Sequence, residues 1–77
     1  MTIHVSIKLY ATLGALSPKR ADRYPVSEGI SVADLLRQLQ VPLQEAKLIF
    51  INGRRAELDA KLHGGERIGV FPPVGGG

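Results

Sequence analysis

The residues with the clearest capacity for chemistry lie at the end of the chain, in the stretch Phe71-Pro72-Pro73-Val74-Gly75-Gly76-Gly77. Two consecutive prolines lack backbone N–H donors and fix two φ angles, so a strand that reaches Phe71 should end there and leave the sheet in an extended direction. The three glycines offer no side chain for packing and carry a large backbone entropy, so we expect residues 72–77 to form a flexible tail. The chemical group at the tip of this tail is the C-terminal carboxylate of Gly77.

A carboxylate on a residue without a Cβ can be threaded into a narrow site on another protein. The six residues after Phe71 reach about 20 Å when they are extended. If the partner holds ATP, the carboxylate can attack it and become an acyl-adenylate, whose carbonyl is then open to a sulfur or amine nucleophile. Glycines at a chain end are in general more often a frayed terminus or a cloning scar, so the rest of the chain has to decide between these interpretations.

The other reactive side chains form no recognisable site. His4 and His63 are the only histidines and have no carboxylate at ligand spacing, so no metal site is predicted. The absence of cysteine excludes disulfides, thiolate metal sites and cysteine nucleophiles. No serine lies in a nucleophile elbow, no glycine cluster resembles a phosphate loop, and Asp34 is explained by a role in capping a helix. The terminal carboxylate is therefore the remaining candidate.

Composition indicates one small globular domain. With 77 residues, of which 44% are hydrophobic and 22% charged, the chain has room for a single core. The longest apolar run, at 48–51, is far shorter than the ~20 residues that cross a bilayer, and no signal peptide is recognisable, so a cytoplasmic protein without membrane contact is expected. The net charge of +3 is a mild excess, and the basic patch at 19–23 has no aromatic-rich strand beside it, so no nucleic-acid partner is predicted.

Two strands and a helix are expected in the first half. Strict alternation of apolar and polar residues over Thr2–Tyr10 predicts a half-buried strand, and Pro25 makes the second strand, at about Arg20–Val26, an edge strand. Ser31 is placed to cap a helix that ends at about Gln40, with Asp34 reaching back in the manner of a capping box. The apolar face of this helix consists of Val32, Leu35, Leu36 and Leu39.

The second half predicts three strands. Lys47–Asn52 and Arg54–Leu58 flank Asn52-Gly53, the signal of a type I′ hairpin. Leu48 and Phe50 point to one side of the first of these strands, and Ile49 and Ile51 point to the other. One apolar pair would therefore lie outside a sheet that is covered on one face only, and we expect Ile49 to be exposed.

The segment Asp59–Gly65 is predicted to form one helical turn with Leu62 pointing inward. The last strand, Arg67–Phe71, directs Ile68 and Val70 into the core and Phe71 outward as a binding anchor. The order of elements predicts an α+β fold in which one helix covers one face of a sheet.

Several pieces of the sequence resemble the MoaD/ThiS group of ubiquitin-like sulfur carriers. They are the helix start Ser31-Val32-Ala33-Asp34-Leu35-Leu36, Ile51-Asn52-Gly53, Gly64-Gly65-Glu66-Arg67-Ile68 and, above all, the Phe-Pro-Pro-Val tail that ends in glycines. The resemblance spans the chain and implies a β-grasp domain over residues 1–71, a mixed sheet of about five strands on one main helix. It further implies that the first and last strands are parallel in the middle of the sheet, and that residues 72–77 form the tail.

The resemblance also implies a function. A ubiquitin-activating-enzyme-like adenylyltransferase would use ATP to activate the Gly77 carboxylate, which becomes a thiocarboxylate, while the carrier itself binds no cofactor and is no enzyme on its own. The tail is most similar to that of the molybdopterin synthase small subunit. This likeness implies that the tail inserts into the large subunit of that enzyme, or into another sulfur acceptor, and donates its sulfur there. The implied contact residues are Tyr10, Ile49, Phe71, Pro72, Pro73, Val74, Gly75 and Gly76.

Two positions depart from the family pattern. A variable residue usually precedes the terminal glycine pair, so Gly75 takes its place here, and Arg54-Arg55 stands where the molybdopterin branch has an apolar contact residue. The alternatives are therefore a thiamine-type or other sulfur carrier, a protein modifier that forms isopeptides through Gly77, and a plain interaction module that binds around Phe71.

Overall fold

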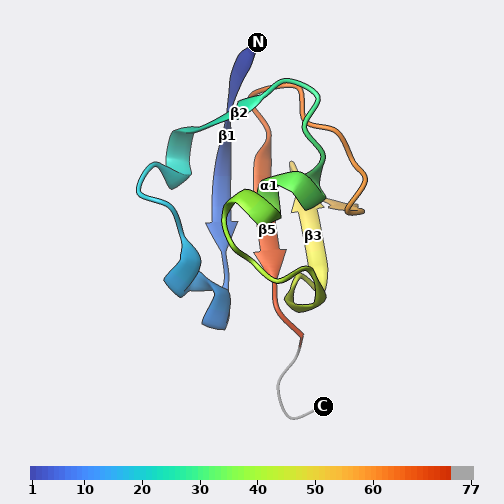
Figure 1. Ribbon diagram of the computed structural model, residues 1–77. Coiled ribbons are helices and arrows are strands. Elements are labelled where there is room, and N and C mark those ends of the chain that lie inside the picture. The colour runs from blue at the N-terminus through green and yellow to red at the C-terminus, as the bar shows by residue number, and fades with distance from the viewer. Residues whose placement is uncertain (74–77) are drawn as a thin grey trace.

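The chain folds into a mixed five-stranded sheet with one α-helix against one of its faces, as Figure 1 shows. The computed structural model describes residues 1–73. The strand order is β2-β1-β5-β3-β4. The elements are β1 (Thr2–Leu9), β2 (Tyr24–Ser27), α1 (Val32–Gln38), β3 (Leu48–Ile51), β4 (Arg54–Ala56) and β5 (Arg67–Phe71).

The first and last strands form the centre of the sheet. β1 and β5 pair in parallel from Ser6 opposite Arg67 to Leu9 opposite Val70, and their arrows run the same way in Figure 1. β2 pairs antiparallel with the outer side of β1 and β4 with the outer side of β3. The central parallel pair and the edge position of the Pro25 strand are thereby confirmed. The second strand begins only at Tyr24, because a 3₁₀ turn (Ala21–Arg23) occupies its predicted start.

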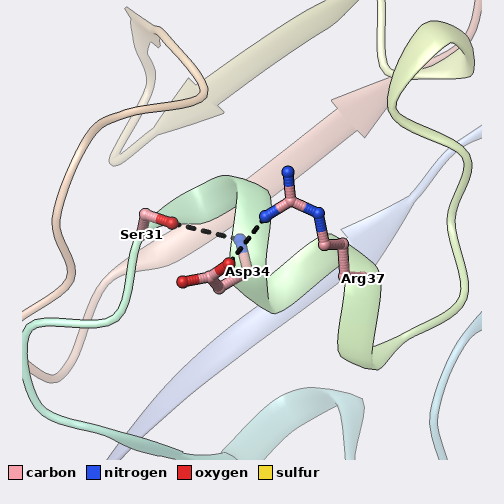
Figure 2. Close-up of polar contacts among 3 residues, drawn as sticks. All are labelled: Ser31, Asp34 and Arg37. Carbon is pink, nitrogen blue, oxygen red and sulfur yellow. Dashed lines mark hydrogen bonds and ion pairs between the residues drawn. The ribbon is translucent and has the colours of Figure 1, made fainter.

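Helix α1 begins where its cap predicts. The backbone N–H of Asp34 donates to the Ser31 hydroxyl at 3.1 Å, so the predicted N-cap is confirmed. The Asp34 carboxylate accepts a hydrogen bond from Arg37 at 2.7 Å, so it lies along the helix surface and not back over the cap (Figure 2). Both side chains are exposed, so this ion pair adds at most about 1 kcal/mol. The helix ends at Gln38, two residues before the predicted end, and Gln40 follows with a φ of 63°.

The core lies between α1 and the sheet face that it covers. Val32, Leu35 and Leu36 of the helix are fully buried, as their spacing predicts. The sheet contributes Val5, Ile7, Leu9, Val26, Ile49, Ile68 and Val70. Within residues 1–73, no helix is both long enough and apolar enough to cross a membrane.

The predicted exposure of Ile49 is wrong. Ile49 is only 4% exposed, because it lies opposite Val70, a core residue of β5. Directly opposed residues in an antiparallel pair share a face of the sheet, so the register with β5 turns Ile49 inward. Leu48, opposite Phe71, and Phe50, opposite Gly69, are the residues of β3 on the uncovered face.

Of the two turns predicted for the second half of the chain, one is confirmed and the other is wrong. The hairpin is confirmed, since Asn52 and Gly53 have φ angles of 53° and 80°, as a type I′ turn requires. The helical turn predicted over Asp59–Gly65 is wrong. Its backbone pairs with the residues before α1 instead, through hydrogen bonds from the Leu62 N–H to the Ile30 carbonyl and from the Gly29 N–H to the Leu62 carbonyl. Leu62 nevertheless points inward as predicted, with 0% exposure.

Candidate functional site

The sheet face opposite α1, called the open face below, carries a group of aromatic side chains. The rings of Tyr10 and Phe71 stack with their centroids 4.1 Å apart and their planes 4° from parallel. The Phe50 ring meets Phe71 edge-on, with centroids 5.8 Å apart and an angle of 84°. Such pairs contribute about 0.5–1.5 kcal/mol each beyond the area that they bury. We call Tyr10, Phe50 and Phe71 the aromatic cluster.

The register of three strands brings these rings together. In the parallel pair Leu9 lies opposite Val70, so Tyr10 follows alongside Phe71 on the opposite face from those two core residues. Gly69 leaves room between the strands, since a Cβ there would lie 3.4 Å from Cε2 of the Tyr10 ring. All three rings are half-buried, and Leu48 extends the apolar surface beside Phe71. Tyr10 and Phe71 therefore share the uncovered face as the resemblance implies, and Phe50 takes the place expected for Ile49.

The chain leaves the sheet at this cluster. The last backbone hydrogen bond of β5 runs from the Lys47 N–H to the Phe71 carbonyl at 2.9 Å, and the strand ends at Phe71. Pro72 is half-buried and Pro73 is exposed, and neither has an N–H with which to extend the ladder. The remaining predicted site residues, Val74, Gly75, Gly76 and Gly77, lie outside the described residues. The aromatic cluster is thus the folded surface from which the tail departs.

A shallow hollow adjoins the aromatic cluster on the open face. It measures about 320 Å³ and includes Ser6, Lys8, Tyr10, Arg67 and Gly69 among its lining. The ammonium of Lys8 lies 5.8 Å from the centroid of the Tyr10 ring, within cation–π range. The hollow holds two cations and no acid, base or nucleophile pair. It fits a binding surface better than a catalytic pocket.

The loop before β5 is held by one carboxylate. Glu66 accepts hydrogen bonds from the backbone N–H groups of His63 and Gly64, each at 2.7 Å. Partial burial raises the pKa of Glu66, but these hydrogen bonds and the nearby charge of His63 outweigh it, so the pKa lies below its usual value. On the other side of β5, the Asn52 side-chain carbonyl accepts from the Arg67 N–H at 2.9 Å. Sequence reasoning missed both of these contacts, the one made by Glu66 and the one made by Asn52. A carboxylate directly after a glycine pair is nevertheless a recognisable sign of the Glu66 contact.

This lowered pKa makes part of the stability dependent on pH. Because the pKa of Glu66 is lower in the folded chain than in the unfolded chain, its contribution is present above the unfolded pKa. We expect that contribution to disappear as the pH falls below the ordinary glutamate pKa of 4.5 and through the lower folded pKa. Glu66→Gln should make the free energy of unfolding less dependent on pH over that interval, as measured by urea denaturation. A Glu57→Gln variant serves as the control, and an equal change in it would contradict the role of Glu66.

The two histidines are not part of a common site. His4 lies on β1 and is half-buried, whereas His63 is exposed in the loop before β5. Over residues 1–73, no group of three or more His, Asp or Glu side chains is arranged to hold a metal ion.

Comparison with known proteins places these features in a family context. The model of the ThiS family matches residues 7–77. SAMP1 from Haloferax volcanii is 26% identical, covering 96% of this chain and 99% of its own, with a TM-score of 0.69. A putative molybdopterin converting factor, subunit 1, from Pyrococcus furiosus is also 26% identical, with coverage of 94% and 99% and a TM-score of 0.63.

A third solved structure supports the fold alone. The thiamine biosynthesis protein ThiS from Geobacter metallireducens is 22% identical, covers 97% of this chain and 100% of its own, and has a TM-score of 0.61. None of the curated proteins matches the sequence. Together with the strand order, these likenesses confirm the predicted α+β fold of the ubiquitin-like β-grasp type.

Proposed function

The chain belongs to the ThiS family, and on that premise we propose that it carries sulfur as a thiocarboxylate on Gly77. The observation that carries the proposal is the exit of the tail from the aromatic cluster, at the end of a domain whose described residues hold no other reactive constellation. A partner that grips Phe71 and the neighbouring rings binds beside the point at which the chain leaves the sheet. The domain then serves to present one carboxylate.

The proposed chemistry takes place in two steps on the partner. The Gly77 carboxylate attacks the α-phosphate of ATP, which forms an acyl-adenylate and releases pyrophosphate. A hydrosulfide ion supplied with the activating enzyme then attacks the carbonyl carbon, the bond from this carbon to the AMP oxygen breaks, AMP leaves, and the terminal group is a thiocarboxylate. ATP is bound by the ubiquitin-activating-enzyme-like adenylyltransferase and not by this chain. Dependence on ATP is in keeping with a cytoplasmic location.

For the acceptor, we infer the large subunit of molybdopterin synthase. The Phe71-Pro72-Pro73-Val74 sequence and the likeness to the Pyrococcus putative molybdopterin converting factor support this choice. The aromatic cluster and Leu48 would be covered by the acceptor while the tail reaches its active site. Arg55, which faces the same side as Phe50, gives this interface a charge that an apolar residue would not.

The intact mass of the protein tests the sulfur-carrier proposal. When the chain is produced together with its own activating enzyme and a sulfur source, its mass should rise by the difference between sulfur and oxygen. Treatment with an alkylating reagent should then label the terminus once, although the chain contains no cysteine. A chain that keeps its unmodified mass under these conditions, while the enzyme adenylates other carriers, would contradict the proposal.

A protein modifier is the second candidate, because the chain is similar to Haloferax SAMP1 over nearly its whole length. Another crystal structure to which the chain is similar is that of small archaeal modifier protein 1 from H. volcanii. In this role the activated Gly77 would react with lysine amines and form isopeptides. Conjugates of higher mass in the cell of origin, lost when Gly77 is deleted, would favour the modifier over the carrier.

A further inference from the structure

The strands of this protein carry positive charge only. The chain has seven acidic residues, and none of them lies in β1, β2, β3, β4 or β5. The same strands contain Lys8, Arg54, Arg55 and Arg67. A modest net charge of +3 therefore conceals a strong separation, in which the acids occupy the helix and the loops.

Three of these cations share the open face with the aromatic cluster. Lys8, on β1, is two residues before Tyr10, which directly follows the strand, so both side chains point to the same side. Arg67 precedes Phe71 by four residues on β5, and Arg55 lies opposite Phe50 in the β3–β4 pair. All three are exposed. The open face thus has an apolar centre with cations contributed by three different strands around it.

The acids of the chain do not neutralise this face. Across residues 1–73, the one ion pair joins Arg37 to Asp34 on α1. The Glu66 carboxylate, next to Arg67 in sequence, is occupied by the backbone of the preceding loop. Asp22 approaches the far end of β1, where it lines a hollow together with Arg23 and His4. Lys8, Arg55 and Arg67 therefore have no partner of opposite charge among the described residues.

We propose that the open face docks on an acidic surface of the activating adenylyltransferase, with carboxylates opposite Lys8, Arg55 and Arg67 and an apolar depression for the aromatic cluster. The inference rests on the proposed function and adds the chemistry of the partner surface. Three unpaired cations around an apolar centre repel a basic partner. Against a neutral partner they would lose their hydration without gaining an opposite charge to offset the cost of desolvation. Against an acidic partner they accelerate association and fix its orientation.

The length of the tail favours the enzyme that activates it as the partner. The carboxylate lies at most about 20 Å of extended chain from Phe71, so an enzyme that holds the carboxylate beside ATP meets the open face first. Single-stranded RNA would be the other natural ligand of aromatic rings on a basic sheet. However, Tyr10 and Phe71 already stack on one another at 4.1 Å, which removes ring faces that a base would need.

Binding of the full chain to its activating enzyme, measured by calorimetry at low and high salt, tests this inference. The Lys8→Glu/Arg67→Glu variant should bind at least about tenfold more weakly at 50 mM salt, and the difference should shrink at about 500 mM. Lys19→Glu/Lys61→Glu is the matched control, since it changes the net charge equally at exposed positions outside the strands. We expect the control to bind within about twofold of the unaltered chain. Circular dichroism and urea denaturation verify that both variants are folded.

The possible results distinguish a failure of the docking inference from a failure of the sulfur-carrier proposal. Equal affinities for the open-face variant and the control, or affinity without salt dependence, would overturn the docking inference even if the tail is charged normally. Charge-dependent binding by a chain that never acquires sulfur would support the docking inference and contradict the carrier. Tighter, salt-dependent binding to a single-stranded RNA oligonucleotide than to the enzyme would also overturn the inference.

Discussion

Deletion of Gly77, or addition of one residue after it, should reduce thiocarboxylate formation at least about 100-fold. One residue displaces the terminal carboxylate by about 3.5 Å, while displacements near 1 Å already cost about 100-fold in well-positioned reactions. In the proposed complex the partner grips the aromatic cluster, which would prevent the chain from sliding along the partner to compensate. The measurement is the initial rate at which the mass shift of the thiocarboxylate appears in the presence of the activating enzyme, ATP and sulfide donor.

The control for this prediction changes the chain length elsewhere. A glycine inserted after Lys19, in the exposed connection between β1 and β2, leaves the distance from Phe71 to the terminus unchanged and should preserve the rate. Normal charging of the chain with one added terminal residue would show that the carboxylate of the last residue is not the reactive group. The carrier proposal would then have to be abandoned, although the fold would stand.

The elements that local rules determine could be predicted from the sequence. Alternation over β1, the Ser31 cap and the Asn52-Gly53 turn each depend on residues within a few positions of one another. Their hydrogen bonds and φ angles agree with the predictions. The central pairing of β1 with β5 joins residues about 60 apart, and the family resemblance supplied it where no local pattern did.

The errors arose where pairing with distant residues decides the conformation. In β3, apolar residues occupy both faces, so alternation alone cannot tell Ile49 from Phe50, and the register with β5 makes the choice. Over Asp59–Gly65, the composition suits a short helical turn, but the backbone of Leu62 bonds to Gly29 and Ile30 on the approach to α1. In both segments, tertiary hydrogen bonding overrides a weak local preference.

The candidate site was predictable only in outline. The two prolines and the position of Phe71 identified the exit of the tail, and β5 does end there. The third ring, Phe50, was missed and the burial of Ile49 was not foreseen, because both depend on the same register. The basic character of the open face was hidden by the acids of the helix and loops, which make the overall charge look ordinary.

Leu62→Ala should destabilise the fold by about 2–5 kcal/mol, the range found when a fully buried leucine is truncated. Leu62 is 0% exposed and comes from a segment without helix or strand. This side chain and three backbone hydrogen bonds hold the segment against the approach and start of α1: two between Leu62 and Gly29 or Ile30, and one from the Val32 N–H to the Ala60 carbonyl. A domain of this size has a total stability of roughly 4–12 kcal/mol, so the loss is a large fraction of it. Urea denaturation followed by circular dichroism measures the change.

Leu16→Ala provides the matched control, since Leu16 is 36% exposed and the same atoms are removed. Its free energy of unfolding should change by no more than about 0.5 kcal/mol. Equal effects at the two positions would mean that the Asp59–Gly65 segment does not hold its core contact in solution. In that case the loop that leads through Glu66 into β5 would be loosely held as well, and the strand that ends at Phe71 would lose the first of the two hydrogen-bonded contacts, by Glu66 and by Asn52, that hold its start.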